Sequence, residues 1–443
     1  MALLRPRRLL LLGLGVVVPC LVLAGGKYPL DLAVYRDGGT AVLHADPLYA
    51  LRIGRYGFTY PPFAALVFSP MAAVSLPIVT VVATAGSLIA LALVMHWSCR
   101  DLLHKPGPTA ALLIVALAAS SPVRETLWNG QINLVLMALV LADVLNVTSP
   151  RWRGALVGLA AAIKLTPALF IVYLALRGRT RDALRASGAF LAATAVAALV
   201  LPQDSFRFWT KEVFTGSGIG DLARVSDQSL HGLVLRGSDS TLAWLIVVVP
   251  TVLAGLYLAV AAGRAGREGL AAGVVGVLGC LISPVSWVHH WVWVLPCLGG
   301  LAGTVRSSHE RRMIAVASAI FVVGPVEAPS DLSRALPPFS PALSWILANT
   351  FILTAVMVGF TALIRLTPVR SRFRQTFPAV RWIRPGSASR WSSRRQVKGY
   401  RQRHAGGKLP IHVVVGIGHV EAFVPSAVIS RTEPNRASPA VPS

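Results

Sequence analysis

Residues 25–70 read GGKYPLDLAVYRDGGTAVLHADPLYALRIGRYGFTYPPFAALVFSP, and this polar, aromatic stretch lies between two strongly apolar segments. Three of its residues are acidic, namely Asp31, Asp37 and Asp46, although the 443 residues of the chain contain only 18 Asp and Glu. The sequence therefore predicts a hydrophilic loop, at about residues 25–60, that leaves a membrane and returns to it.

The composition places the chain among membrane proteins. Hydrophobic residues make up 54% of it, the mean hydropathy is +0.64 and only 14% of the residues are charged, which excludes a water-soluble domain of this length. A transmembrane helix needs roughly 20 apolar residues, and about a dozen such stretches or part-stretches lie between Leu9 and Ile364. Within these stretches the apolar residues follow one another and do not alternate with polar ones, which favours transmembrane helices over the strands of a β-barrel. We expect an all-α polytopic membrane protein with about 10–13 transmembrane or re-entrant helices.

About half of the formal net charge of +24 lies at the C-terminal end, where residues 365–443 hold 15 Lys and Arg and two Glu. A basic tail after the last span indicates the cytoplasmic side of the membrane. We therefore expect a transmembrane domain at residues 1–366 and a disordered cytoplasmic tail at 367–443, which is rich in Ser, Pro, Gly and Arg. This distribution argues against nucleic acid as a partner and favours anionic membrane lipids.

Flanking charge also predicts the topology of the spans. The apolar segment Leu9–Ala24 follows the basic sequence RPRR, so we expect an uncleaved first helix with a cytoplasmic N-terminus, in preference to a secretory signal. The loop at 25–60 then lies outside a plasma membrane that the chain crosses many times. The basic links at 263–268 and 306–312 lie inside by the same rule.

A lysine and a proline interrupt the apolar segment at residues 154–176. Pro167 frees a backbone carbonyl, and the ammonium of Lys164 needs a partner at membrane depth. We therefore expect a broken or re-entrant segment that places Lys164 near the outer surface. The alternative is one kinked helix in which Lys164 is paired inside the bundle.

With the spans and links assigned in this way, five polar sequences lie on the extracytoplasmic face: FTYPP, WNGQ, KLTP, SDQSLHG and SPVSWVHH. The second large loop, at 202–240, lies on the same face and contains FRFWTKEVF, whose mixed aromatic and charged character predicts an interfacial helix. The convergence indicates one external site built from several helices. Its candidate residues are Tyr60, Gln131, Asn133, Lys164, Gln228, His231, His289 and His290.

An enzyme outside the membrane has neither ATP nor nucleotide sugars, and the chain lacks a Walker A loop and a dinucleotide fingerprint. Such an enzyme draws on a lipid-linked sugar donor. The reaction needs a carboxylate that takes the proton of the acceptor hydroxyl, and a cation that stabilises the departing phosphate. Because a single phosphate leaves as a weak base, we expect no general acid, no metal and no other cofactor.

Six sequences occur in one order between about residues 28 and 300: DLAVYRDGG, FTYPPFAALVF, NGQINLVLMALVLAD, GLAAAIKLTPALF, DQSLHG and SPVSWVHHWVWVLP. In this series the chain resembles glycosyltransferase family 87, the actinobacterial polyprenol-phosphate-mannose-dependent α-(1→2)-mannosyltransferases of the GT-C type. The resemblance implies a GT-C-like bundle and an inverting transfer of mannose. The implied donor is a polyprenyl phosphate mannose, and the implied acceptor is a cell-envelope glycolipid or lipoglycan.

The resemblance also implies roles for single residues. The acid of DLAVY, Asp31, is the expected catalytic base, and Asp37 is the alternative base. Lys164 is our candidate for the donor phosphate, although it is almost as well explained as a partner of the carbonyls freed by Pro167.

The other candidates are expected to bind substrate: Tyr60, Gln131, Asn133, Gln228, His231, His289 and His290. For the buried amides, hydrogen bonding between helices is an equal alternative. The competing function is a transporter or flippase of a lipid-linked sugar, because intramembrane acids and broken helices occur there too.

Overall fold

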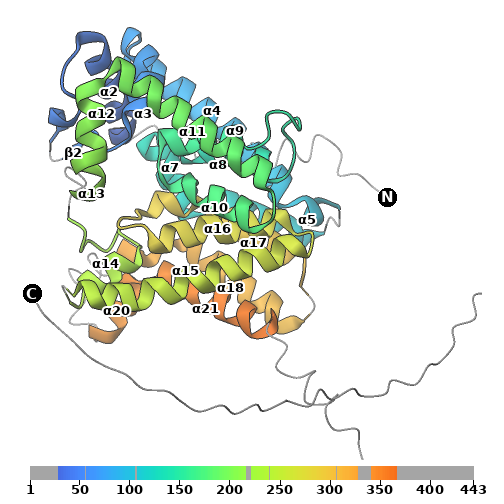
Figure 1. The fold of residues 1–443 in the computed structure, drawn as a ribbon. Helices are drawn as coiled ribbons and strands as arrows, with labels where there is room; N and C mark the ends of the chain where they lie inside the picture. Colours follow the sequence, from blue (N-terminus) through green and yellow to red (C-terminus); the bar gives the residue numbers. More distant parts are fainter. Residues whose placement is uncertain are drawn as a thin grey trace, which may run out of the picture. The chain divides into compact units, whose positions relative to one another are not determined.

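The structure is a computed structural model that describes residues 28–54, 56–104, 107–215, 221–238, 240–305, 307–327 and 341–366. Regular structure within these residues is almost entirely helical (Figure 1). Their only sheet is a hairpin of β1 (Arg52–Ile53) and β2 (Tyr56–Gly57). The predicted first helix at Leu9–Ala24 and the predicted tail at 367–443 lie outside the described residues.

Several helices are long and apolar enough, by length and composition, to cross a membrane. The four clear cases are α4 (Leu76–Ser98), α6 (Pro108–Ala118) continued by α7 (Ser121–Asn129), α11 (Thr180–Val200) and α15 (Thr241–Arg264). A fifth is the pair α20 (Pro341–Ala348) and α21 (Thr350–Leu366), which is bent by 77°. Shorter apolar helices are α3 (Pro62–Phe68) with η2 (Ser69–Ala73), α8 (Asn133–Val144), α10 (Leu169–Leu176) and α16 (Glu268–Ile282).

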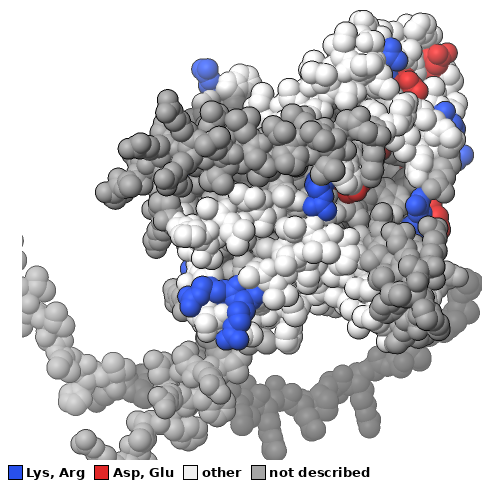
Figure 2. All heavy atoms as spheres, turned by 180° about the vertical axis from the view of Figure 1, so that it is seen from behind, with Lys and Arg blue, Asp and Glu red and all other residues white. Residues whose placement is uncertain are grey.

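The surface agrees with a membrane environment. On the face shown in Figure 2, most of the described atoms belong to uncharged residues, and the charged side chains form a few small groups. The class predicted from composition, an all-α polytopic membrane protein, is therefore confirmed. Further described elements are η1 (Leu48–Ala50), α5 (Arg100–His104), η5 (Val288–Trp293), α17 (Val294–Ala302), α18 (Ser308–Val323) and η6 (Pro325–Glu327).

The acidic stretch near the N-terminus is a helix, so its prediction as a loop was wrong. The helix α2 runs over Leu30–His44, and Asp31 lies in its first turn. The buried pair Gly38 and Gly39 permits a close approach, since a Cβ on Gly39 would meet the backbone of Phe68. Tight packing against α3 and η2 thus gives α2 a buried face that its own sequence does not reveal.

The segment that carries Lys164 is broken, as predicted. The helix α9 (Ala155–Ile163) ends where Lys164 adopts an extended conformation, with φ −145° and ψ 126°. Pro167 lies in the short 3-10 turn η3 (Thr166–Ala168) that leads into α10. Lys164 therefore lies on irregular backbone between two short helices and not on the face of one continuous helix.

The loop predicted at 202–240 is largely helical in its described part. It contains α12 (Pro202–Arg207), the π-helix η4 (Phe208–Glu212), α13 (Val213–Thr215) and α14 (Leu230–Leu235). The sequence FRFWTKEVF is helical, as expected, and exposes Phe206 by 73% and Phe214 by 81%. An antiparallel bridge between Asp227 and Trp287 joins this region to the segment after α16.

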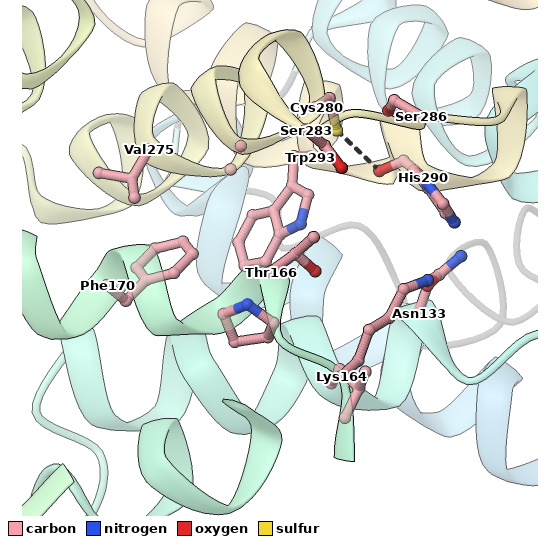
Figure 3. A pocket seen from close by; sticks show the side chains of 14 residues that line it. Asn133, Lys164, Thr166, Phe170, Val275, Cys280, Ser283, Ser286, His290 and Trp293 are labelled. Atoms are coloured by element: carbon pink, nitrogen blue, oxygen red, sulfur yellow. Dashed lines mark hydrogen bonds between the residues drawn. The ribbon is translucent and has the colours of Figure 1, made fainter. Parts of the chain in front are cut away.

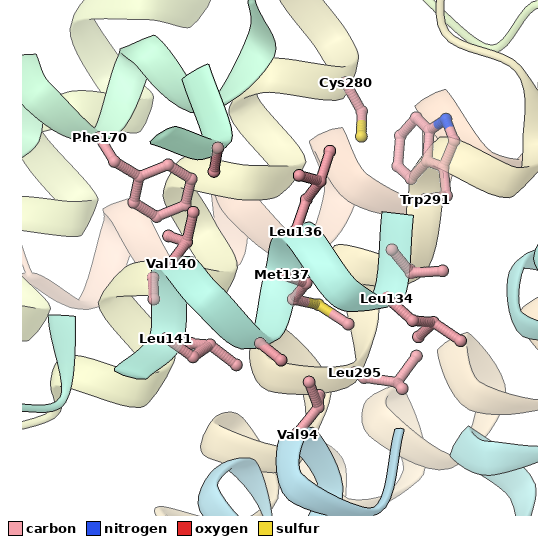
Figure 4. Close-up of a cluster of buried hydrophobic side chains, with 14 of the residues drawn as sticks. Val94, Leu134, Leu136, Met137, Val140, Leu141, Phe170, Cys280, Trp291 and Leu295 are labelled. Carbon is pink, nitrogen blue, oxygen red and sulfur yellow. The ribbon is translucent and has the colours of Figure 1, made fainter. Parts of the chain in front are cut away.

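The helix α8 lies in the middle of the buried core, where it packs against α4, α9 and α16 (Figure 4). Leu134, Met137 and Leu141 of α8 are 0% exposed, as are Val94 of α4 and Leu295 of α17. Burying an aliphatic side chain of this size stabilises the fold by about 1.5–3 kcal/mol. This packing fixes the N-terminal end of α8, where the polar sequence WNGQIN enters the core.

Candidate functional site

The polar site is built around Asp31, which comes from the first turn of α2 and is half-buried. The Gln131 side chain and the charge of Lys164 lie within reach of its carboxylate. Burial raises the pKa of Asp31, and these two contacts oppose the rise. The structure thus brings together the predicted base, a predicted amide and the predicted cation.

Gln131 lies in the link between α7 and α8 and is 3% exposed. Its Oε1 accepts a hydrogen bond of 2.7 Å from the hydroxyl of Tyr35 and one of 3.2 Å from that of Tyr60. The two phenol oxygens are themselves 2.7 Å apart. Tyr60, which the sequence predicts for the site, is therefore part of it, and Tyr35 is an addition that sequence reasoning missed.

Lys164 is anchored by Asn133 and lies near the ring of Tyr60. Its Nζ donates to Asn133 Oδ1 at 2.8 Å and lies 5.5 Å from the centre of the Tyr60 ring. Asn133 uses its other amide atom to donate to the backbone carbonyl of His289 at 3.0 Å, and Thr126 donates to the same carbonyl at 3.1 Å. Asn133 therefore links the lysine to the histidine segment and holds both in place.

The histidine pair lies in η5, with ring centres 4.7 Å apart. His289 is 8% exposed, and its buried Nε2 has no hydrogen-bond partner within the described residues. His290 lines a cavity beside Lys164. Both histidines therefore lie in the same polar site as Asn133 and Lys164, as the sequence predicts.

This cavity has two chemically different sides (Figure 3). Asn133, Lys164 and His290 lie on one side, and the rings and methyls of Phe170 and Val275 lie on the other. The remaining lining residues are Leu136, Thr166, Pro167, Gly276, Gly279, Cys280, Ser283, Ser286 and Trp293. Such a cavity can take a ligand with a charged head and an apolar continuation.

Gln228 and His231 lie apart from the cavity lining, and the amide of Gln228 and one ring nitrogen of His231 make contacts within the protein. The amide nitrogen of Gln228 donates to the carbonyls of Val225 and Ala348, and its oxygen accepts from the backbone N–H of Phe351 at 3.3 Å. His231 Nδ1 lies 3.1 Å from the carbonyl oxygen of Pro284. These contacts hold the second loop against its neighbours, and the expectation that Gln228 and His231 bind substrate stays a prediction.

The alternative base, Asp37, lies on α2 with Asp31. Six residues at about 100° per residue place the two side chains about 120° apart around the helix. Burial raises the pKa of Asp37, and the charge of Arg36 opposes the rise. The geometry favours Asp31 because the Gln131 and Lys164 side chains act on its carboxylate.

Asp227 is a second residue that sequence reasoning missed. Its side chain is 0% exposed, and Oδ1 accepts backbone hydrogen bonds from Ser229 at 3.0 Å and Ser286 at 2.8 Å. Asp227 thereby fixes the start of the segment that leads to the histidine pair. An acid followed by Gln and Ser just before a short helix was the available signal, because acids in such positions often accept backbone N–H groups.

Comparisons with known proteins identify the family of the chain. A model of glycosyltransferase family 87 matches residues 58–284. The chain is 34% identical to a polyprenol-phosphate-mannose-dependent alpha-(1-2)-phosphatidylinositol mannoside mannosyltransferase of Mycobacterium tuberculosis, over 80% of this chain and 89% of the relative. It is 33% identical to a corresponding phosphatidylinositol pentamannoside mannosyltransferase of that species, over 66% of this chain and 70% of the relative.

Among solved structures, the chain is similar to ArnT from Cupriavidus metallidurans bound to undecaprenyl phosphate, with a TM-score of 0.42 and 15% identity. That match covers 81% of this chain and 77% of the other. The family model and the mycobacterial relatives describe glycosyltransferases, which sets aside the alternative of a transporter or flippase. The chain therefore belongs to glycosyltransferase family 87, as its series of motifs predicts.

Proposed function

We propose that this glycosyltransferase moves mannose from a polyprenyl phosphate mannose to a hydroxyl of a cell-envelope glycolipid or lipoglycan, with inversion and an α-(1→2) product. The mycobacterial relatives depend on polyprenol-phosphate-mannose and act on phosphatidylinositol mannosides, which supports this donor and this class of acceptor. One observation carries the proposal: Lys164, which lines a cavity with a polar and an apolar side, lies within range of the charge of Asp31, a residue far away in the sequence.

Asp31 is assigned the role of general base. The acceptor oxygen attacks the anomeric carbon of the donor, its proton passes to a carboxylate oxygen of Asp31, and the bond from the anomeric carbon to the phosphate oxygen breaks. The raised pKa strengthens the carboxylate as a base, while the hydrogen bond from Gln131 and the charge of Lys164 favour its ionised form.

Lys164 is assigned to the donor phosphate. Its ammonium, at the cavity wall, stabilises the negative charge that grows on the phosphate as the polyprenyl phosphate leaves. His290 adds a ring nitrogen on the same side of the cavity, and Phe170 supplies an apolar surface for the first part of the lipid. Since the leaving group is a weak base and one cation faces it, the proposal assigns no metal, no other cofactor and no general acid.

The site is assigned to the extracytoplasmic face of the plasma membrane, with both termini in the cytoplasm. The second loop enters α15 at Thr241, and the basic link at 263–268 follows the other end of this helix. A helix of 24 residues is about 36 Å long, enough to separate the two faces of a bilayer. The placement of basic links on the side away from the loops supports this orientation.

The proposal is tested in membranes that contain the protein, a radiolabelled polyprenyl phosphomannose and a phosphatidylinositol mannoside acceptor. Asp31→Asn should lower transfer by about 10²- to 10⁴-fold, the usual contribution of a general base. Asp37→Asn, on the same helix, is the matched control and should retain transfer. Retained transfer in Asp31→Asn would refute the base assignment, and a wild-type protein that forms no mannosidic bond would refute the proposed donor and acceptor.

A further inference from the structure

The amide of Gln131 can point in only one direction. Both tyrosine hydroxyls donate to its Oε1, so its Nε2 amino group faces away from them and is the side-chain donor that Gln131 can offer the nearby Asp31 carboxylate, whose pKa Gln131 lowers. If the amide were flipped, Oε1 would face the carboxylate, and two acceptors would meet. The orientation of the amide that touches Asp31 is thus determined by Tyr35 and Tyr60.

The phenols are themselves held in place. Each phenol carries one hydrogen. Tyr35 gives its hydrogen to Gln131 at 2.7 Å, and Tyr60 directs its own toward the Tyr35 oxygen at 2.7 Å and Gln131 at 3.2 Å. Tyr35 is 1% exposed, its ring stacks on Phe68 with centres 4.5 Å apart, and the edge of Tyr60 lies 5.1 Å away. The position of the Tyr35 hydroxyl is therefore fixed by packing on both sides.

Few other groups act on the Asp31 carboxylate. Gln131 and Lys164 are the side chains that lower its pKa. The elements that pack against α2 also carry Tyr49 on η1, Arg52 on β1, His96 on α4, and Arg124 and Glu125 on α7, while α2 itself carries Arg36, Asp37 and His44. The hydrogen bond from Gln131 is therefore the main neutral interaction available to stabilise the ionised base.

We propose that Tyr35 is a positioning residue of the transfer reaction. Supported by Tyr60, it fixes the Gln131 amide so that Nε2 donates to one oxygen of Asp31 and leaves the other oxygen for the acceptor hydroxyl. Tyr35 acts through Gln131 and touches neither substrate. This inference depends on the proposed role of Asp31 as the base.

The variant Tyr35→Phe tests the inference, because it keeps the ring that stacks on Phe68 and removes only the hydroxyl. A less well oriented amide stabilises the ionised carboxylate less, so the acidic limb of the pH profile of kcat/KM should move to higher pH by about one unit. At pH values below the limb, kcat/KM should fall by about tenfold, whereas KM for the donor should stay within about twofold. Activity should partly recover at high pH, which a misfolded protein would not show.

The control for this variant is Tyr257→Phe, which removes the hydroxyl of a tyrosine on α15 that is 48% exposed. It should leave both the rate and the acidic limb unchanged. The pair Tyr35→Phe and Gln131→Met then tests the coupling. Because Tyr35 acts only through the Gln131 amide, which Gln131→Met removes, the double variant should lose no more activity than Gln131→Met alone.

Two results would overturn the inference: an unmoved acidic limb in Tyr35→Phe, or losses that multiply in the double variant. A failure of the positioning role of Tyr35 can be distinguished from a failure of the base role of Asp31. If Asp31→Asn is inactive while Tyr35→Phe behaves like the wild type, only the role of Tyr35 falls. If Asp31→Asn remains active, both fall.

Discussion

Replacing Lys164 by glutamine tests the centre of the site most directly. The substitution removes a positive charge that acts on Asp31 and that, in the proposed mechanism, faces the donor phosphate. It changes little else, because a glutamine amide can still donate to Asn133 Oδ1, which accepts from Lys164 at 2.8 Å. The expected loss is therefore electrostatic.

The size of the loss follows from Coulomb's law. Two unit charges about 4 Å apart in a medium of effective dielectric constant about 20 interact by about 4 kcal/mol. This sets an upper bound, and about 1.4 kcal/mol corresponds to a factor of ten in rate. We expect kcat/KM for the donor to fall by about 10²- to 10³-fold in Lys164→Gln.

The pH profile gives a second readout of the same variant. The charge of Lys164 lowers the pKa of Asp31, so its removal should raise that pKa. The base then stays protonated to a higher pH, and the acidic limb of kcat/KM should move upward.

Steady-state kinetics with varied donor at several pH values measure both effects. Lys211→Gln, in the exposed part of η4, is the matched control and should behave like the wild type. The reasoning is refuted if Lys164→Gln keeps kcat/KM for the donor within about threefold of the wild type, or if the only change is in KM for the acceptor.

Three further predictions concern other parts of the molecule. Because burial raises the pKa of Asp31 above the usual 3.8, the acidic limb of kcat/KM in the wild type should lie above that pH, and a limb below it would contradict the site geometry. Gln228→Leu removes three buried hydrogen bonds, so thermal unfolding in detergent should show a loss of about 2–4 kcal/mol, and an unchanged Tm would refute the structural role. Gly39→Ala should destabilise the protein by about 1–3 kcal/mol, because the added methyl group would clash with the backbone of Phe68. The control Gly86→Ala, whose methyl group meets open space beside α4, should stabilise the protein slightly. Equal effects of the two substitutions would argue against the packing of α2.

Much of the site was predictable because polar residues within a membrane are costly, so those that occur in apolar sequence indicate a contact or a site. A lysine, two amides and two histidines within apolar sequence need partners, and the structure shows that Lys164 donates to Asn133, which in turn donates to the backbone carbonyl of His289. The break at Lys164 also followed from local sequence, since Pro167 cannot continue a helix without disturbance. These features depend on residues close together in the sequence, or on the high free-energy cost of burying a polar group without a hydrogen-bond partner.

The features that sequence reasoning missed depend on distant contacts. The acids and paired glycines of α2 are typical of a loop, and only the tight packing of Gly39 against Phe68 explains why they form a helix. Gln228 likewise has the appearance of a loop residue that could meet a substrate. Its partner Ala348 lies far along the sequence, and no local pattern identifies that partner.

The interrupted helix at Lys164 has an electrostatic consequence of its own. The helix α9 stops at Ile163, so its last carbonyl groups, which carry the negative end of the helix dipole, terminate beside Lys164. The dipole of α9 and Asn133 Oδ1, which accepts from Lys164 Nζ at 2.8 Å, thus add to the charge of Asp31 in favouring the ammonium form of the lysine. The ammonium therefore does not depend on the carboxylate alone when Asp31 takes up a proton.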